Sequence, residues 1–92
     1  MIYRIIQECV QNVLKHAQAT RLDIAMITAN EELDITIEDN GVGFDAPSSD
    51  IIITTGLKTI QSRIAYLNGK LDLNSKPGIG TILAFYVPLN QL

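Results

Sequence analysis

Apolar and polar positions recur along this chain with two different periods, and each change of period marks a new element. Over residues 2–18 the apolar positions recur at intervals of three and four, which is typical of an amphipathic helix. The same spacing returns over residues 57–68. Steps of two, the pattern of β-strands, are found over residues 20–28, 33–38, 71–73 and 81–87. The chain is therefore predicted to form a helix, two strands, a second helix and two more strands.

Short polar or glycine-containing segments connect these elements. Residues 30–32 predict a turn that makes the first two strands an antiparallel hairpin, and residues 40–56 predict a mobile loop. Asn68-Gly69 predicts a left-handed cap on the second helix, and residues 76–80 predict a turn. This order of elements predicts an α/β fold of the α+β type. We expect a two-layer sandwich whose mixed, mostly antiparallel sheet carries helices on one face.

Several apolar side chains are predicted to form the core or the wall of a pocket, because apolar side chains exclude water at both kinds of position. The first helix places Cys9 on its apolar face, so this cysteine is predicted to be buried and structural. The second strand is predicted to turn Leu33, Ile35 and Ile37 inward. The positions predicted as core or pocket wall are Ile24, Ile37, Phe44, Ile60, Ile64 and Ile82.

Composition and charge narrow the classes of function. The chain has 92 residues, 47% of them hydrophobic, and a net charge of −3. This length allows one domain over residues 1–92, and the hydrophobic content argues against disorder. The lack of a basic run argues against a nucleic-acid partner. A single cysteine cannot form an internal disulfide, so a reducing, cytoplasmic compartment is expected. No apolar stretch approaches the ~20 residues that span a bilayer, so no membrane contact is expected.

The segment with the most chemical information follows the second strand. Asp39 ends that strand, and Gly41 and Gly43 follow within four positions. Glycine lets the backbone turn tightly and lets a ligand approach closely. A carboxylate accepts a hydrogen bond from the exocyclic amine of adenine and repels the carbonyl oxygen of guanine. The alternative is that Asp39 only starts its own turn.

Three further motifs accompany Asp39-x-Gly41-x-Gly43-Phe44, and they stand in a fixed order. They are Glu8-x3-Asn12-x2-Lys15-His16-Ala17, then Gly56-Leu57 before a helix with Arg63, then Gly78-x-Gly80-Thr81. In order and spacing, the four motifs resemble the N box and the three glycine boxes of the GHKL ATPases, in the form used by sensor histidine kinases. The Lys15-His16-Ala17 run, together with a short lid segment over the nucleotide, resembles the corresponding segments of one histidine kinase subfamily. The partner regulators of that subfamily carry LuxR- or NarL-type DNA-binding domains.

The resemblance implies a role for each residue of the first two motifs. Asp39 would bind the adenine amine, while Gly41 and Gly43 would pass under the base and hinge the lid. Asn12 would hold Mg²⁺ through its side-chain oxygen, and Glu8 would be the catalytic residue that orients or deprotonates the attacking group. Lys15 and His16 would lie near the phosphates and offset their charge. As alternatives, the helix residues form an ordinary solvated face and His16 is structural. The resemblance also allows an acid next to the acceptor histidine, outside this chain, to act as the base in place of Glu8.

The remaining motifs would complete the nucleotide site. Gly56 and Leu57 would open a helix whose free N–H groups favour phosphate oxygens. Gly78 and Gly80 would lie close to the ligand, and Thr81 would hydrogen-bond near the adenine, directly or through water. The alternatives are an ordinary loop glycine at Gly56, hairpin-turn glycines at positions 78 and 80, and a strand that merely begins at Thr81.

The resemblance implies the ATP-binding catalytic domain of a two-component sensor histidine kinase, an ATP-dependent protein-histidine kinase with ATP and Mg²⁺ as cofactors. Its expected partners are a dimerisation and histidine-phosphotransfer domain of the parent chain and a response regulator with a LuxR- or NarL-type DNA-binding domain. The acceptor histidine would lie elsewhere, because His16 belongs to the N box. The alternatives are a non-catalytic nucleotide-sensing or interaction module on the same fold, or another GHKL ATPase or serine kinase.

The chain departs from the family pattern at two places. Thr54-Thr55-Gly56-Leu57 stands where many relatives have Gly-x-Gly-Leu. Met1 leads directly into a helical pattern without an N-cap residue, so we expect an N-terminally truncated fragment that lacks the family's preceding strand and does not phosphorylate itself. A missing strand leaves a sheet edge unpaired, and unpaired edges recruit other chains. An edge-mediated homodimer or poor solubility is therefore expected.

Overall fold

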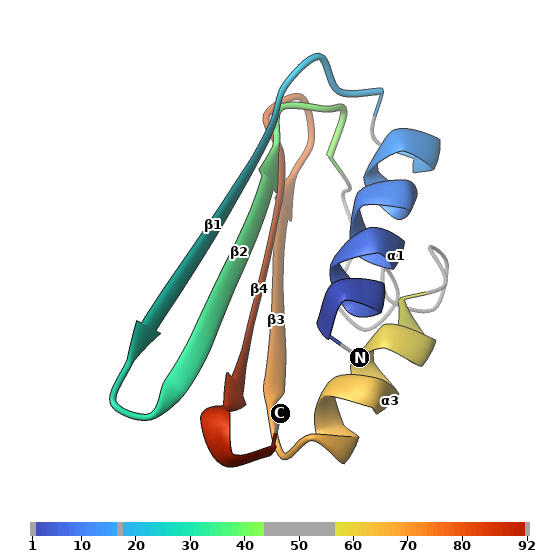
Figure 1. Ribbon diagram of the computed structural model, residues 1–92. Coiled ribbons are helices and arrows are strands. Elements are labelled where there is room, and N and C mark those ends of the chain that lie inside the picture. The colour runs from blue at the N-terminus through green and yellow to red at the C-terminus, as the bar shows by residue number, and fades with distance from the viewer. Residues whose placement is uncertain (1, 17, 44–56, 92) are drawn as a thin grey trace.

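The computed structural model describes residues 2–16, 18–43 and 57–91 (Figure 1). The helices are α1 (Ile2–His16), α3 (Lys58–Tyr66) and a short 3-10 helix, η1 (Leu89–Gln91). The strands are β1 (Leu22–Ala29), β2 (Glu32–Asp39), β3 (Lys70–Lys76) and β4 (Gly80–Pro88). The predicted loop over residues 40–56 lies outside the described residues from position 44 onward.

The described strands form one sheet in the order β1-β2-β4-β3, and each neighbouring pair is antiparallel. Asn30 and Glu31 both adopt positive φ angles of 54° and 62°, a backbone that matches the twist of a two-residue hairpin. Both α1 and α3 lie on one side of the sheet (Figure 1). The predicted two-layer α+β sandwich is therefore confirmed, with a sheet that is antiparallel throughout the described part.

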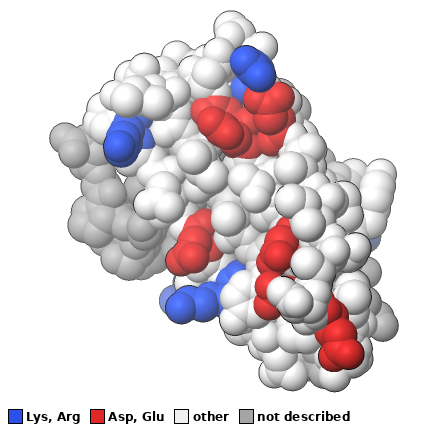
Figure 2. Space-filling model, turned by 90° about the vertical axis from the view of Figure 1, so that its left-hand side faces the viewer, with Lys and Arg blue, Asp and Glu red and all other residues white. Residues whose placement is uncertain are grey.

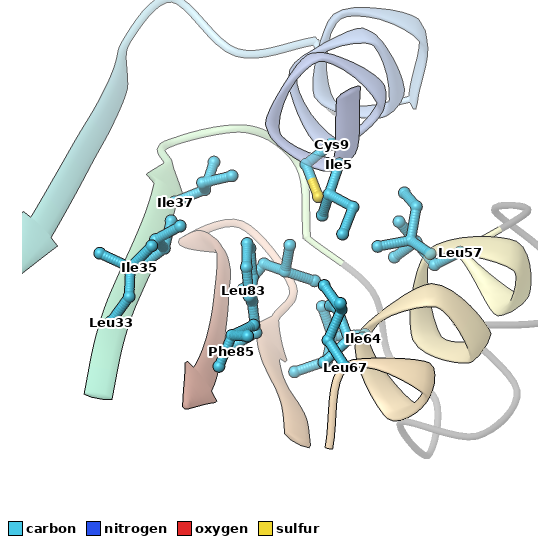
Figure 3. Packing of buried hydrophobic residues seen from close by; sticks show 13 residues of the cluster. Ile5, Cys9, Leu33, Ile35, Ile37, Leu57, Ile64, Leu67, Leu83 and Phe85 are labelled. Carbon is cyan, nitrogen blue, oxygen red and sulfur yellow. The ribbon is translucent and has the colours of Figure 1, made fainter. Parts of the chain in front are cut away.

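The core fills the space between this sheet and the two helices (Figure 3). Alternate residues of β2 and β4 face the helices, and α1 contributes Ile5 and Cys9 to the same cluster. A fully buried isoleucine contributes about 1.5–3 kcal/mol through the hydrophobic effect. The predicted core positions that are buried are Cys9, Leu33, Ile35, Ile37, Ile60 and Ile64.

The core prediction is wrong for Ile24 and Ile82, whose side chains are 45% and 40% exposed. Strand β1 forms one edge of the sheet, whereas α1 packs on β2 and α3 packs on β3 and β4. Ile24 therefore lies on the helix-facing side but beyond the helices. Ile82 lies on the opposite face, next to Glu38 and Asn74 in the register. Phe44 lies outside the described residues.

Two element boundaries differ from the predictions for identifiable reasons. Helix α3 ends at Tyr66, and Asn68, with a φ angle of 59°, takes the predicted left-handed conformation. Gly69 is required by close packing, since a Cβ atom there would lie 2.1 Å from the Tyr86 carbonyl oxygen. Strand β3 runs on to Lys76, beyond the predicted end at residue 73, because it pairs with β4 as far as Gly80.

Candidate nucleotide-binding site

The strand register brings three polar side chains into one row at the end of the helix-facing side of the sheet. Asp39 lies opposite Thr81, and Thr81 lies opposite Ser75. Directly opposite residues of antiparallel strands point to the same face. We call these three residues the polar row. The next row on this face is apolar and buried, and it consists of Ile37, Leu83 and Leu73.

Asp39 is the buried charged residue of the described part, with only 6% of its surface exposed. Its Oδ1 atom accepts a hydrogen bond of 2.8 Å from the Gly41 amide, so it does start its own turn. Its Oδ2 atom accepts no hydrogen bond from any described residue. Every fully buried side-chain oxygen of the described residues does have a hydrogen-bond partner, so Oδ2 is not fully buried. Oδ2 therefore keeps some solvent contact. One oxygen fixes the carboxylate, and the other is available to a ligand that donates a hydrogen bond.

The loop after Asp39 packs directly against the turn between β3 and β4. The Gly78 amide donates a hydrogen bond of 2.7 Å to the Val42 carbonyl oxygen. Gly43 has a φ angle of 67°, and a Cβ atom there would lie 2.0 Å from the Lys76 carbonyl oxygen. A side chain at position 43 is thus excluded by backbone packing as well as by backbone conformation.

The glycines of the β3–β4 turn differ in what they require. A Cβ atom on Gly80 would lie 2.0 Å from the Asp39 carbonyl oxygen, so this glycine lets β4 approach the end of β2. Gly78 has a φ angle of 76° with open space around it, as expected of a turn glycine. Gly41 is buried, and its amide donates the hydrogen bond to Asp39 Oδ1. Gly43 and Gly80 therefore have packing roles that hold the polar row in place.

Asn40 is a structural residue of this site that the sequence analysis missed. Its Oδ1 atom accepts hydrogen bonds from the Thr20 and Arg21 amides at 3.0 and 2.9 Å, and its Nδ2 atom donates to the Thr20 hydroxyl at 2.9 Å. These bonds tie the connection between α1 and β1 to the end of β2. Asparagine is also common in turns, so its sequence position alone did not reveal this contact.

Glu8 and Asn12 are both half-buried and lie one turn apart on α1. The Glu8 carboxylate forms an ion pair with Arg63 of α3, and the two side chains keep 29% and 34% of their surface exposed. The predicted catalytic residue is therefore held by a guanidinium group that ties the two helices together. Because 55 residues separate the partners, no local pattern could have predicted the pair.

Cys9 lies beside Glu8 on α1 but faces the core, with 2% of its surface exposed. Burial, and then the negative charge of Glu8, raise the pKa of the Cys9 thiol to about 12. A thiol with this pKa stays protonated and unreactive at neutral pH. The prediction of a buried structural cysteine is confirmed.

The remaining predicted site residues are distributed over three places. Lys15 and His16 belong to the last turn of α1, but their side chains lie outside the described part. Gly56 is also outside it. Leu57 directly precedes α3, and its side chain is buried in the core (Figure 3), so only its backbone is suited to the predicted phosphate contact.

These elements converge on one end of the molecule. The C-terminal end of α1, the end of β2 and the β3–β4 turn lie together at the top of Figure 1. The structure therefore groups the N-box helix with the first and last glycine motifs. Among the described residues, no cluster of three or more His, Cys, Asp or Glu side chains could hold a metal ion.

The opposite face of the sheet has a different character (Figure 2). Acidic side chains gather on this face, which points away from the helices. They include Asp23, Glu32, Asp34, Glu38 and Asp72. The side-chain hydrogen bond to Asp34 raises the pKa of Glu32, as expected where carboxyl groups crowd. Like charges repel a triphosphate, so this face does not suit a nucleotide.

Comparison with known proteins identifies the family. Residues 1–91 match the family described as histidine kinase-, DNA gyrase B- and HSP90-like ATPase. The chain belongs to this ATPase family, in agreement with the resemblance of its four motifs. None of the helices within the described residues is long and apolar enough to cross a bilayer.

Similar proteins of known name are sensor histidine kinases. The chain is 38% identical to the sensor histidine kinase ComP of Bacillus subtilis over 86% of its own length and 10% of that protein. It is 31% identical to the histidine-protein kinase/phosphatase DegS of Brevibacillus brevis over 96% of its length and 22% of DegS. The chain thus spans a small part of the curated relatives that it matches.

Solved structures support the fold. The chain superposes on the histidine kinase AdeS of Acinetobacter baumannii with a TM-score of 0.81, at 20% identity, over 97% of this chain and 46% of that chain. It superposes on the ATP-binding domain of PrrB from Mycobacterium tuberculosis with a TM-score of 0.77, at 22% identity, over 95% of this chain and 65% of that chain. The predicted α+β fold of histidine kinase ATP-binding domains is confirmed.

Proposed function

We propose that residues 1–92 form the ATP-binding catalytic domain of a two-component sensor histidine kinase. Such a domain would catalyse the transfer of the γ-phosphoryl group of Mg-ATP to a histidine on a separate dimerisation domain. The observation that carries the proposal is the buried Asp39 carboxylate beside two glycine turns, in a chain of this ATPase family. An almost buried charge is costly unless it is paired, and one oxygen of this carboxylate still lacks a donor among the described residues.

The Asp39 carboxylate would select adenine. A carboxylate accepts a hydrogen bond from the N6 amine of adenine, whereas guanine presents a carbonyl oxygen at the same position. Gly41 and Gly43 would pass under the base, and Gly80 and Thr81 border the same end of the sheet. Ile37, directly below Asp39 on the same face, is buried and belongs to the core beneath the proposed adenine site.

The phosphates and the metal ion would lie along α1. Mg²⁺ binds few protein ligands and takes the rest from water and phosphate oxygens. The lack of a carboxylate cluster in the described part fits this coordination, in which the Asn12 side-chain oxygen would be the protein ligand. The bound ion would neutralise charge on the phosphates. Lys15 and His16 would add positive charge, and the backbone N–H groups at Gly56 and Leu57 would bind phosphate oxygens.

Glu8 is the proposed catalytic residue on α1. Its ion pair with Arg63 holds the carboxylate in one orientation, one helical turn before Asn12. In this role Glu8 would orient or deprotonate the attacking imidazole. The same ion pair favours a second candidate function, a non-catalytic nucleotide-sensing module, because the carboxylate that would act on the attacking imidazole is already engaged by Arg63.

The proposed setting is that of a two-component system. The partners would be the dimerisation and histidine-phosphotransfer domain of the parent chain and a response regulator with a LuxR- or NarL-type DNA-binding domain. The parent chain would place this domain in the cytoplasm, with or without a membrane anchor elsewhere. The relatives ComP and DegS support this setting, because both are histidine kinases of signal transduction.

The edge strand β1 supports the proposed homodimer of the 92-residue chain. Ile27 and Met26 are 61% and 54% exposed on its two faces, and the strand pairs only with β2 among the described residues. Exposed edges of this kind recruit other chains. A sedimentation experiment at high concentration should show dimers that a Met26→Lys substitution reduces, whereas a monomer at all concentrations would contradict this part.

The function is tested in two stages. Isothermal calorimetry with Mg-ATP and Mg-GTP should show binding of ATP alone, and Asp39→Asn should abolish it. Asp72→Asn, the same chemical change on the acidic open face, is the matched control and should leave ATP binding unchanged. Equal affinity for both nucleotides, or an unaffected Asp39 variant, would refute the proposed adenine site.

The second stage separates a kinase from a nucleotide sensor. A separately prepared helical hairpin bearing the acceptor histidine is mixed with the chain and γ-labelled ATP. The kinase proposal predicts label on that histidine, and none on the 92-residue chain alone. Nucleotide binding without transfer would favour the non-catalytic module.

A further inference from the structure

We propose that Ser75 is a positioning residue that directs the Thr81 hydroxyl toward N1 of a bound adenine. The inference rests on the proposed nucleotide-binding function and adds a second point of base recognition beside the Asp39 carboxylate. Ser75 lies on β3, outside every motif that the sequence analysis selected, and it joins the site only through the strand register.

The placement of Ser75 comes from the pairing of three strands. Thr81 of β4 lies between Asp39 of β2 and Ser75 of β3, so the three side chains share one face. Both hydroxyl-bearing residues are half-buried. The row beneath is apolar, so the core itself has no need of hydroxyl groups at this level. A polar row at the end of an otherwise apolar face therefore points to a polar ligand.

The two hydroxyl groups are directly linked. Ser75 Oγ lies 2.8 Å from Thr81 Oγ1, and either atom can be the donor. Ser75 Oγ also donates to the Gly80 carbonyl oxygen at 3.3 Å, a longer contact. A hydroxyl carries one proton. If the Ser75 hydroxyl donates its proton to Thr81 Oγ1, the Thr81 hydroxyl can donate its own proton to a ligand. If the Ser75 hydroxyl donates to the Gly80 carbonyl oxygen instead, the Thr81 hydroxyl donates to Ser75 Oγ.

This linkage matches the edge of adenine. Adenine presents a donor at N6 and an acceptor at N1, and a carboxylate can only accept. Asp39 can therefore take only the N6 amine, which leaves N1 in need of a donor. The Thr81 hydroxyl, set by Ser75, supplies that donor from the adjacent strand, directly or through a water molecule. Guanine presents an oxygen at C6, which the Asp39 carboxylate repels. Its N1–H could still donate to the Thr81 hydroxyl oxygen, so the discrimination against guanine comes from Asp39.

The test is a set of calorimetric titrations of the 92-residue chain with the magnesium complexes of ATP and 1-deaza-ATP, in which a C–H group replaces N1. Ser75→Ala should weaken ATP binding about 2- to 10-fold, the usual range for one hydrogen bond, and leave 1-deaza-ATP binding unchanged. Thr81→Val should behave in the same way, and the double variant should bind ATP no more weakly than Thr81→Val alone. Ser62→Ala, on the exposed surface of α3, is the matched control.

Three results would overturn the proposal, and they are distinguishable. If Ser75→Ala weakens both nucleotides by the same factor, Ser75 has only a structural role. If it weakens neither, Ser75 has no role in binding. If the unmodified chain binds no ATP at all, the proposed function fails first and this inference fails with it. Thermal unfolding of each variant confirms that a weaker titration does not come from unfolded protein.

Discussion

Two neighbouring rows on the same face of the sheet differ completely in chemistry. The polar row at the end of the sheet consists of Asp39, Thr81 and Ser75, and the row beneath it consists of Ile37, Leu83 and Leu73. The same three strands form both rows. The lower row is buried against the helices, whereas the polar row borders the glycine loop and the β3–β4 turn.

The difference separates residues that hold the fold from residues that serve a ligand. Apolar side chains in the lower row stabilise the sandwich through burial. Asp39 of the polar row is nearly as buried as the apolar residues of the lower row. Burial of its charge costs free energy. A fold selected for stability alone would continue the apolar pattern for one more row. The interruption is therefore consistent with the proposed nucleotide site, and substitutions in the two rows should have separable effects.

The largest expected effect comes from the lower row. Ile37→Ala should destabilise the fold by about 2–5 kcal/mol, because it leaves a cavity in a packed core. Ile82→Ala, on the open face of the neighbouring strand and 40% exposed, should cost less than about 1 kcal/mol. Urea unfolding measures both values. Equal losses of stability in the two variants would mean that Ile37 is not more buried than Ile82.

A somewhat smaller effect is expected where the polar row meets the glycine turn. Gly80→Ala should cost about 2–4 kcal/mol, because it combines backbone strain with a clash against the Asp39 carbonyl oxygen. Gly78→Ala shares the positive φ angle but has open space around it, so it should cost only about 1–2 kcal/mol. A Gly78 variant that unfolds more easily than the Gly80 variant would argue against this close approach.

The buried thiol of α1 gives a pH-dependent effect. The native Cys9 has a pKa of about 12, whereas an exposed thiol has a pKa of about 8.5. Between these values the unfolded chain has lost the proton and the native chain retains it. Stability should therefore fall as the pH rises through this window, by up to about 1.4 kcal/mol per pH unit. The free energy of unfolding of the unmodified chain and of Cys9→Ala, measured at pH 8 and pH 10, isolates this contribution. If both chains lose the same amount of stability between the two pH values, the burial of the thiol is contradicted.

The smallest effect is expected for the ion pair between the helices. A double-mutant cycle with Glu8→Gln and Arg63→Gln should give a coupling free energy of about 0.2–1 kcal/mol, since both groups keep partial solvent contact. The more exposed pair of Arg21 and Asp23, with side chains 73% and 56% exposed, should couple less. The reverse order would show that the Glu8 pair does not persist in solution.

The sequence predicted the class of fold because this class depends on local patterns. The candidate site residues were selected by local patterns too, and they remain predictions. Alternation identified the strands, and it correctly placed Ile35 and Ile37 inside. The turn glycines and the strand-ending Asp39 are local signals as well. The resemblance of the four motifs then added the roles, and the family match confirmed the class.

What the sequence did not predict depends on contacts between distant segments. Alternation cannot tell which strand becomes the edge, so Ile24 was wrongly placed in the core. Ser75 entered the site through the register of β3 on β4, and Arg63 reached Glu8 through helix packing. Such pairings are set by the whole fold and leave no periodic trace in the chain.

The central claim is that the polar row binds the adenine of ATP. Amide chemical shifts of the isotope-labelled chain, followed by NMR during a Mg-ATP titration, test it most directly. We predict the largest shifts at Gly41, Ser75 and Thr81, with Ile27 and Tyr86 on the open face unchanged. Saturating shifts centred on the open face, or no shifts anywhere, would contradict the account.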